Sequence, residues 1–499
     1  MRTRVGEQVS SLSPAQAVLL VIAFGTIVRL LLAAAVGLGI DESYMAGVSR
    51  QVSWSYFDHP PIHVWLAGFW AKLFGDSAFV IRLPFIALFA GSTWLMFRLT
   101  SFVYGERAGL WAVLAFSLAP AFTLSTGSWV LPDGPMVFFM LLAAYLAARV
   151  LLAEAPDKTT ALWLWLGAGA AGGAAILCKY LGVFFFAGIG LYLLTSPAQR
   201  RWLARPEPWL GLVLAALMFA PVVLWNATNG FASFAFQGQR GLPSYFNATW
   251  FLQNVGGQLL YLLPWLAVPL GYAAFRNIGS SSERDRFFVW LAVPAIVTFL
   301  VLGFVTRVLP HWAMAGWLFA FPLLGRMAAE LQQERRARLR RATVATAVAL
   351  LGFFVIAGSQ AMSGWVNRVA PGLAFKDPTL DLLDWRALDA AVASSGLDLS
   401  NDFVATAHWM EAGKVNYAVG RTVPVLCLCS DARHFAFLHD NKDYEGRNAL
   451  LLSRREGLID AMAPHFASVE KLPDIVLTRG GQPAIVVKAA RATAFKGDR

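Results

Sequence analysis

Residues 40–74 read IDESYMAGVSRQVSWSYFDHPPIHVWLAGFWAKLF and follow a long apolar run. The acidic pair Asp41-Glu42 stands where that run ends, and Asp58-His59 comes directly before two prolines. Carboxylates at the mouth of a membrane helix are costly unless they have a function. We therefore interpret this segment as one wall of an active site at a membrane surface.

The composition indicates a polytopic α-helical membrane protein. Of the 499 residues, 57% are hydrophobic and 14% are charged, whereas an ordinary soluble domain has about 25% charged residues. Many apolar runs reach the ~20 residues that cross a bilayer. The net charge of +11 comes from basic residues in short loops between these runs. Because this pattern is the positive-inside signature, it explains the charge without a nucleic-acid partner.

The basic loops predict the topology. Arg2 and Arg4 place the N-terminus in the cytoplasm and Asp41 on the outer face. The first apolar run is long and lacks a clear cleavage site, so we read it as a span rather than a signal peptide. Residues 161–195 fit one tilted helix or two short ones, and the parity of the loops favours two. Lys179 then lies at the outer face between them, and Gly172-Gly173 allows close packing.

This reading predicts about eleven spans. They cover residues 15–38, 77–97, 108–126, 136–152, two segments within 161–195, 209–225, 257–275, 287–305, 313–329 and 342–362. An odd number of spans from a cytoplasmic start predicts that the C-terminus lies in the periplasm, on the outer side of a bacterial inner membrane.

Two short amphipathic helices are expected between the first two spans. Tyr44, Val48 and Val52 recur at every fourth position and predict a helix in the membrane interface over 43–54. Pro60-Pro61 predicts the start of a second helix. The apolar face expected for it consists of Ile62, Trp65, Leu66, Phe69 and Leu73.

After Trp365 the composition changes, and charges occur throughout. We expect a transmembrane domain over 1–365, with its catalytic loop at 39–76, and a small periplasmic α/β domain over 366–499. Strands are predicted near 403–407, 424–428, 449–452 and 484–487, and helices over 380–392 and 409–417.

The polar residues of this second domain give weaker signals. Three cysteines give no disulfide framework. Cys427 and Cys429 have a spacing more typical of a strand face than of a bridge. Glu411 and Lys414 are interpreted as a solvated helix face. The histidines lack metal-ligand spacing, so no metal ligand is assigned.

The predicted topology brings the notable polar groups to the outer ends of the spans. They are Asp41, Glu42, Asp58, His59, Asp133, Lys179, Arg307 and His311. Simpler roles stay open for three positions. Asp58 fits a helix cap, Asp133 fits a Pro-Asp-Gly turn, and His311-Trp312 fits an interfacial anchor.

Carboxylates beside cations indicate a definite chemistry. A carboxylate can remove the proton of a hydroxyl, and Lys or Arg can hold a phosphate and stabilise the charge that builds on it. Because nucleotide-activated donors are absent outside the cytoplasm, the donor there is expected to be lipid-linked. This reasoning predicts glycosyl transfer from a polyprenyl-phosphate sugar to an envelope glycolipid, polysaccharide or protein.

Three motifs resemble a known family. Asp41-Glu42 after the first span, YFDHPP at 56–61 and PDGP at 132–135 resemble bacterial members of glycosyltransferase family 39. These are protein O-mannosyltransferase-like enzymes of the GT-C fold, and they are related to the aminoarabinose transferases that modify lipid A. Residues 178–180 and 310–312 are also similar to this group, so the resemblance covers roughly 15–330.

The resemblance implies roles for individual residues. Asp41 is implied as the catalytic base and Glu42 as a residue that orients donor or acceptor. Asp58 is implied to line the same cavity, and Asp133 corresponds to the second acidic motif of the family. The aminoarabinose transferases have a phosphate-holding Lys at the position of His59, so the phosphate-binding role shifts towards Lys179 and Arg307. The donor and phosphate group is assigned to Lys179, Arg307, His59 and His311. The family inverts the anomeric carbon and usually uses no nucleotide, and the need for a divalent cation stays open.

Two other functions compete. A transporter of a polar or anionic solute should carry ionisable residues near the middle of the bilayer and show an internal repeat. In the sequence the charges cluster at one face and the halves do not match. A structural or assembly protein with an outer sensor domain explains residues 366–499 but leaves Asp41-Glu42 without a role.

Overall fold

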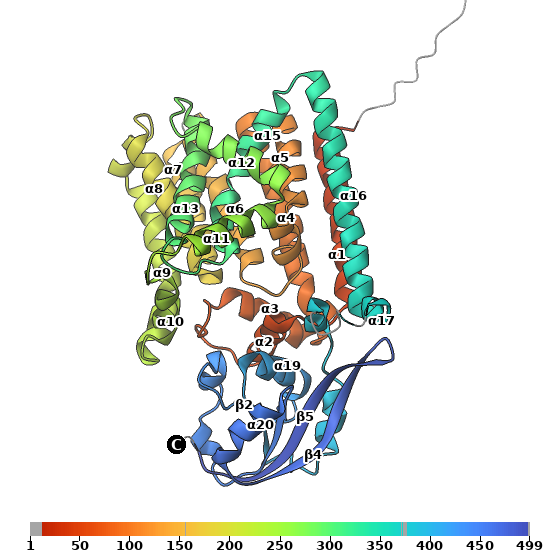
Figure 1. Cartoon of the computed structure of the whole chain (residues 1–499). Coiled ribbons are helices and arrows are strands. Elements are labelled where there is room, and N and C mark those ends of the chain that lie inside the picture. The colour runs from red at the N-terminus through yellow and green to blue at the C-terminus, as the bar shows by residue number, and fades with distance from the viewer. Residues whose placement is uncertain (1–11, 155, 371, 373–376, 498–499) are drawn as a thin grey trace, which may run out of the picture.

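The computed structural model describes residues 12–154, 156–370, 372 and 377–497. Long helices form the larger part of the molecule, and a smaller domain is built around a sheet (Figure 1). The short helices α2 and α3 lie between these two parts. Arg2 and Arg4, on which the predicted cytoplasmic start depends, lie outside the described residues.

Helices occupy each of the predicted spans. They are α1 (Pro14–Ala35), α4 (Ala78–Tyr104), α5 (Glu106–Leu118), α6 (Asp133–Leu151), α7 (Lys158–Cys178), α8 (Val183–Thr195), α9 (Pro206–Thr228), α11 (Ala248–Leu262), α12 (Pro264–Arg276), α13 (Glu283–Leu302), α14 (Met314–Trp317), α15 (Ala320–Ala329) and α16 (Gln333–Ser363). Within the described residues, seven helices are long and apolar enough to cross a membrane. The pair α11 and α12, bent by 104°, would make eight. The helices at the other predicted spans, such as α5 and α8 with 13 residues each, are shorter than the ~20 residues that cross a bilayer.

The two helices predicted within 161–195 are α7 and α8, but only α8 is short, since α7 has 21 residues and is long enough to cross a membrane. Lys179 lies in the break between them with extended backbone. The predicted close packing at the glycine pair is also found. A Cβ atom on Gly172 would lie 2.5 Å from Cζ of Phe186, and one on Gly173 would lie 3.0 Å from Cα of Ala215 in α9. Glycine is therefore required for α7 to approach its neighbours so closely.

The helices of the first outer loop differ from the expectation. Helix α2 (Ile40–Val48) begins at the acidic pair rather than after it, and Val52 lies beyond its end, 86% exposed. Helix α3 (Ile62–Phe74) follows the two prolines as expected, but it turns the opposite face inward. His63, Val64 and Ala67 are buried, whereas Phe69 and Leu73 are exposed. The rest of the predicted apolar face, Ile62, Trp65 and Leu66, is half-buried against neighbouring apolar residues. Only the end of that face with Phe69 and Leu73 is left open.

The C-terminal domain has a five-stranded sheet in the order β2-β1-β3-β5-β4. Strands β1 (Phe403–Thr406), β2 (Val425–Cys427) and β3 (Ala449–Ser453) are parallel, and β2 lies at one edge of the sheet. The long strands β4 (Phe466–Arg479) and β5 (Gln482–Phe495) form an antiparallel hairpin. The sheet is accompanied by helices α18 (Leu388–Ala393), α19 (Trp409–Val419) and α20 (Glu456–Met462).

Four expectations for this domain need correction. Strand β4 was not expected, because most of its residues face solvent and its sequence lacks a buried apolar run. The helix predicted over 380–392 is reduced to a short turn and α18. Cys427 and Cys429 are paired as a disulfide. Lys414 is 4% exposed and is not part of a solvated face. The predicted boundary after residue 365 stays a prediction, since α17 (Trp365–Val369) runs across it.

Helix α19 docks the sheet domain onto the first outer loop. A Cβ atom on Gly413 would lie 2.9 Å from Cβ of Tyr44 in α2. Lys414, one residue further on, donates to the carbonyl oxygens of Leu38, Asp381 (2.6 Å) and Leu383 (3.0 Å). The Tyr417 hydroxyl donates to the carbonyl oxygen of Asp76 at 2.7 Å. One buried lysine therefore connects the end of α1 to the C-terminal domain.

Replacing Lys414 with Met should lower the free energy of unfolding by about 1–3 kcal/mol, because three carbonyl oxygens lose their buried donor. Thermal unfolding of the purified protein, followed by tryptophan fluorescence, measures this change. Lys442→Met, at an exposed position of the same domain, is the control. Equal melting temperatures for the two variants would contradict the docking role.

Candidate active site

The centre of the candidate site is a buried ion pair between Glu42 and Arg82. Glu42 is 2% exposed and so is Arg82, which projects from α4. Their side chains meet at two points, with Nε to Oε1 at 2.8 Å and Nη2 to Oε2 at 2.6 Å. Burial alone would raise the pKa of Glu42, but Arg82 outweighs it and holds that pKa below the usual value. Glu42 is therefore a carboxylate whose charge is already compensated.

The same pair joins several chain segments. Glu42 also accepts from the backbone N–H of Gly39 (2.8 Å) and of Val130 (3.1 Å). Arg82 donates to the carbonyl oxygens of Val36 (2.9 Å) and Gly37 (2.8 Å), which lie at the C-terminal end of α1. An arginine at this end of a helix satisfies carbonyls that have no partner within the helix. The pair thus fixes α1, α2, α4 and the loop before α6 relative to one another.

Asp41 is in a different situation from its neighbour. Its side chain lines a cavity, and it forms no hydrogen bond or ion pair with any residue that the structure describes. Surrounding protein raises the pKa of Asp41 by desolvation; Arg433 opposes this and Glu42 adds to it. A carboxylate without a partner and with a raised pKa is suited to accept a proton from a bound hydroxyl.

Asp58 is buried and pairs with the C-terminal domain. Its Oδ2 atom lies 3.4 Å from Nη1 of Arg433, and its Oδ1 atom has no partner within the described residues. Desolvation raises the pKa of Asp58 to about 6, although Arg433 and the Tyr44 hydroxyl oppose that shift. The guanidinium of Arg433 lies over the rings of Trp409 (4.3 Å) and Phe236 (5.0 Å). A residue from the sheet domain therefore reaches the loop between α1 and α4.

Asp133 and Lys179 form a second buried pair. Nζ of Lys179 lies 2.9 Å from both carboxylate oxygens of Asp133. Asp133 is the first residue of α6, where a carboxylate is favoured by the helix dipole. Because Lys179 stands in the break between α7 and α8, its side chain can reach this helix end.

Three histidines surround the second pair. Desolvation is the main cause that lowers the pKa of His63 to about 3, of His311 to about 4 and of His59 well below its ordinary value. The charge of Lys179 lowers all three further. Burial therefore favours the neutral form of His59 and His311, in which a ring nitrogen can form a hydrogen bond to a ligand.

Two arginines take contrasting positions. Arg240 in α10 (Ala232–Gly241) lies between the rings of Phe236 and Trp312, 5.3 and 5.2 Å from their centroids. Its charge acts on Asp41, Asp58, His59 and His311. Arg307 is exposed and lies over the ring of Trp250 at 5.7 Å.

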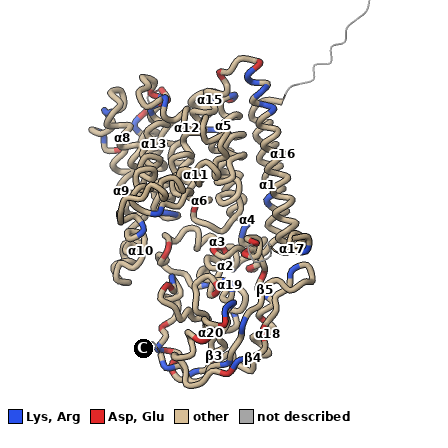
Figure 2. The backbone as a smooth tube through the Cα atoms, viewed as in Figure 1, with Lys and Arg blue, Asp and Glu red and all other residues tan. Residues whose placement is uncertain are grey.

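The structure thus brings Asp41, Asp58, His59, Asp133, Lys179 and His311 into one electrostatic neighbourhood and leaves Arg307 at its edge. Figure 2 shows acidic and basic residues gathered near α2 and α3, between the helical body and the sheet domain. Among the described residues, no group of three or more His, Cys, Asp or Glu side chains could hold a metal ion.

Four arginines of this region were not recognised from sequence as site residues. Arg82 stands inside a predicted span, and a charge in such a run is itself a signal of function. Arg29 is a second case: it is buried in α1 and donates to Thr123, so the statement that charges cluster at one face is wrong. Arg240 lies in a polar segment of the sequence, where an arginine is ordinary, and Arg433 belongs to the C-terminal domain. The sequence offers no signal for Arg433.

Comparison with known proteins shows what this chain is similar to. A family model described as dolichyl-phosphate-mannose-protein mannosyltransferase matches residues 58–225. The chain is 27% identical over 295 residues to the lipid A galacturonosyltransferase RgtD of Rhizobium johnstonii. That match covers 56% of this chain and 58% of the relative.

Solved structures establish the fold. The structure of ArnT from Cupriavidus metallidurans bound to undecaprenyl phosphate is similar with a TM-score of 0.68 and 18% identity, over 95% of this chain and 97% of that one. The apo state of the same ArnT gives a TM-score of 0.66 and 16% identity, over 96% and 98% of the two chains. The chain has the GT-C fold, with several helices long and apolar enough to cross a membrane and a small C-terminal sheet domain. The GT-C fold that the resemblance implies is confirmed.

The ion pair at the centre of the site gives a stability prediction. Glu42→Gln should lower the free energy of unfolding by about 3–5 kcal/mol, because it leaves the charge of Arg82 buried without a partner. Asp41→Asn, at the adjacent residue, should change it little, since that side chain has no partner to lose among the residues that the structure describes. Thermal unfolding of the two variants in detergent measures the difference, and comparable melting temperatures would contradict the assignment of Glu42 as the structural carboxylate.

Proposed function

We propose that this protein is an inverting glycosyltransferase that moves a sugar from a polyprenyl-phosphate donor to an envelope acceptor at the outer face of the inner membrane. The observation that carries this proposal is the unequal state of two adjacent carboxylates. Glu42 is neutralised by Arg82, whereas Asp41 is unpaired and faces a cavity. This arrangement supports Asp41 as a single catalytic base whose position is fixed by the neighbouring ion pair of Glu42 and Arg82.

The reaction is a single displacement. Asp41 takes the proton from an acceptor hydroxyl while that oxygen attacks the anomeric carbon of the donor sugar. The bond between this carbon and the phosphate oxygen breaks, and its electron pair leaves with polyprenyl phosphate. Attack from the face opposite the leaving group inverts the anomeric carbon. Neither a nucleotide nor an enzyme-bound sugar is needed in this scheme.

The leaving phosphate is assigned to the neighbourhood of Arg240 and Lys179. Arg240 forms no ion pair within the described chain, so its charge is available to an anion. Lys179 is balanced by Asp133 and can share its Nζ–H donors with a phosphate oxygen. His59 and His311 supply neutral hydrogen-bonding groups beside it. Arg307 remains in the proposed donor-binding group, although its exposed side chain lies at the edge of the site.

The acceptor and the orientation are part of the proposal. The similarity to a lipid A galacturonosyltransferase favours an envelope glycolipid as the acceptor. The basic cluster at the start of α16, from Arg335 to Arg341, favours the cytoplasm for that end of the helix. Residues 366–499 and the loop 39–76 would then lie together in the periplasm.

A transporter is the alternative function, and Arg29 within α1 is the kind of residue that it would use. However, the guanidinium of Arg29 is held by Gly25 and Thr123, and the charged groups that form a neighbourhood lie at the level of α2 and α3. This distribution fits a surface reaction better than a path across the bilayer.

Asp41→Asn tests the proposed base directly. The change keeps the size of the side chain and removes its ability to accept a proton, so the rate of transfer should fall by at least about a hundredfold. Release of polyprenyl phosphate from a labelled donor by the purified protein measures the rate. A variant that keeps near-normal turnover would exclude Asp41 as the base.

Arg240→Ala and Arg307→Ala form a matched pair for the phosphate. Loss of a charged contact to the donor should raise its KM roughly tenfold or more. We expect the effect to be larger for Arg240, which lies among the site residues, than for the exposed Arg307. Donor titration at a fixed acceptor concentration gives both values. If KM for the donor is unchanged in both variants, the phosphate site lies elsewhere.

A further inference from the structure

The disulfide between Cys427 and Cys429 has no part in the proposed reaction. The two cysteines are two positions apart, so the bridge encloses a single residue. In the chain-entropy account, stabilisation by a disulfide grows with the number of residues in the closed loop. This bridge therefore contributes little to holding distant parts of the fold together. What it restrains is the local direction of the chain where β2 ends.

On one side of the bridge, the sheet fixes the chain. Cys427 is the last residue of β2 and pairs with Thr406 of β1, and the N–H of Leu428 donates to the carbonyl oxygen of Thr406 at 2.8 Å. On the other side, Cys429 leads into a turn that ends in a 3-10 helix, Arg433–Phe437. We call residues 430–437 the docking turn. Through the bridge, the sheet determines where this turn starts.

The docking turn contains a residue with an uncommon backbone conformation. Arg433 has a φ of 55°, in the left-handed region that residues with a side chain seldom adopt. Such a conformation persists when the surrounding structure imposes it. Two restraints are present here, the disulfide that precedes the turn and the contacts that the side chain of Arg433 makes. Without the disulfide, the turn is freer to relax toward an ordinary backbone.

The docking turn packs against the loop that follows α1. Nη1 of Arg433 lies 3.4 Å from Oδ2 of Asp58. The N–H of His434 donates to the Tyr44 hydroxyl at 2.9 Å, and Nδ1 of His434 accepts from the N–H of Phe57 at 3.2 Å. Tyr44 belongs to α2, the helix that also carries the acidic pair. The position of the docking turn therefore bears directly on the helix that holds the proposed base.

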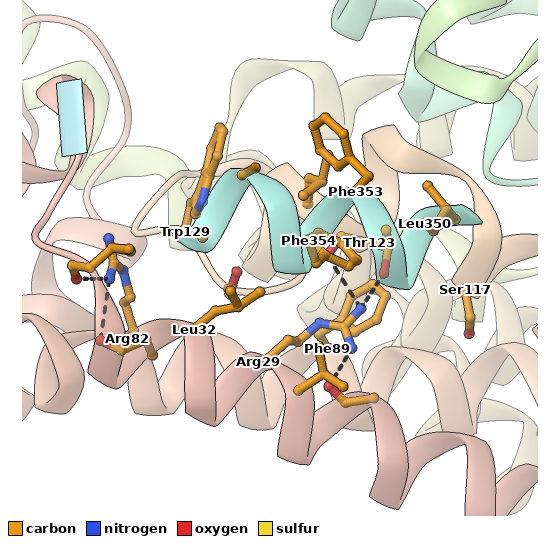
Figure 3. Close-up of a pocket in the computed structure, with 18 of the residues that line it drawn as sticks. Arg29, Leu32, Arg82, Phe89, Ser117, Thr123, Trp129, Leu350, Phe353 and Phe354 are labelled. Carbon is orange, nitrogen blue, oxygen red and sulfur yellow. Dashed lines mark hydrogen bonds between the residues drawn. The ribbon is translucent and has the colours of Figure 1, made fainter. Parts of the chain in front are cut away.

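The docking turn also supports a wall of the cavity that Asp41 faces. This cavity has a volume of about 1060 Å³. Its lining includes Arg82 and Trp129, which Figure 3 shows, and Trp409 of α19. The guanidinium of Arg433 lies over the Trp409 ring, 4.3 Å from its centroid. Displacement of the turn would remove this support from Trp409.

Arg433 acts on the proposed base through its charge as well. Of the charged groups around Asp41, Arg433 lowers the pKa of that carboxyl most. Glu42 and Asp381 raise the same pKa, and Arg240 lowers it. If Arg433 moves away, the pKa of Asp41 rises, because a nearby positive charge favours the carboxylate form. The base would then be unprotonated only at higher pH.

A dithiol can reduce the bridge. Cys427 is 8% exposed, whereas Cys429 is half-buried and is the sulfur that a reductant reaches. A thiolate of the dithiol attacks Sγ of Cys429, the S–S bond breaks, and the sulfur of Cys427 leaves and takes up a proton. The second thiol of the reductant then displaces Cys429 as a thiol and closes the reductant's own disulfide. Two electrons pass from the dithiol to the bridge, and both cysteines end as thiols.

We propose that the Cys427–Cys429 disulfide is a redox-sensitive restraint that holds the docking turn against the candidate site, and that its reduction by a dithiol loosens this wall and slows sugar transfer. The effect on transfer rests on the proposed function, whereas the restraint itself does not. In the proposed orientation the bridge lies in the periplasm, an oxidising compartment in which disulfides persist. We therefore expect the restraint to be formed in the active protein.

Thiol counting and hydrogen–deuterium exchange test the restraint without turnover. The chain has three cysteines, and Cys178 is free, so reduction can act on no other bridge. Alkylation of the denatured full-length protein should modify one thiol before treatment with dithiothreitol and three after it. In the native protein in detergent, reduction should speed the exchange of backbone amides in the docking turn and in residues 40–61. Helix α13, in the helical body, is the internal reference and should exchange at the same rate (Figure 1).

Transfer by the same protein tests the consequence. Release of polyprenyl phosphate should slow about tenfold on reduction, as expected for the loss of one hydrogen bond to a charged group. Reoxidation with oxidised glutathione should restore the rate. The acidic limb of the pH–rate profile should move to higher pH in the reduced protein, because the charge of Arg433 no longer lowers the pKa of Asp41.

The matched variant is Cys427→Ala/Cys429→Ala. It should transfer at the rate of the reduced wild type, and dithiothreitol should not change that rate. If this variant does not fold, the wild type before and after reduction carries the test alone.

The outcomes separate the restraint from the function. Faster exchange after reduction, with no transfer under any condition, would support the restraint and reject the transferase. Equal rates of transfer before and after complete reduction would overturn the proposal and keep the transferase. Three thiols alkylated without reduction, or unchanged exchange in the docking turn, would overturn the proposal as well.

Discussion

The buried pair of Glu42 and Arg82 is the interaction on which the rest of the site depends. A carboxylate and a guanidinium that are each 2% exposed are stable only because each charge is matched and nearly every donor and acceptor is used. Through this pair, the end of α1, the start of α2 and helix α4 share one rigid junction. The neighbouring Asp41 is consequently held in place while its own carboxylate remains unpaired.

The C-terminal domain completes this junction from the other side. Lys414 donates to the carbonyl oxygen of Leu38 just beyond the end of α1, and Arg433 reaches Asp58 in the loop between α1 and α4. The backbone N–H of His434 donates to the Tyr44 hydroxyl at 2.9 Å, and Nδ1 of His434 accepts from the N–H of Phe57 at 3.2 Å. The sheet domain is therefore built into the wall of the candidate site, which explains how a loop of short helices keeps a fixed shape at a membrane surface.

Sequence reasoning succeeded where the signal is local. Apolar runs located the helices, the break at Lys179 divided residues 161–195, and the outer acidic and basic motifs proved to be neighbours. It failed where partners are distant in the chain. The role of Arg433 depends on a contact across 375 residues with Asp58, and the inward face of α3 is set by its packing rather than by its most apolar side. Strand β4 was missed because a solvent-exposed hairpin strand carries little apolar periodicity.

The central claim is that an unpaired Asp41 drives transfer of a sugar to an envelope acceptor. Mass spectrometry of envelope lipids and glycans tests it most directly, in cells that lack the protein and in the same cells rescued with the wild type or with Asp41→Asn. The account predicts that one sugar-sized mass increment disappears without the protein and returns only with the wild type. Unchanged envelope components in cells lacking the protein, or full rescue by Asp41→Asn, would contradict it.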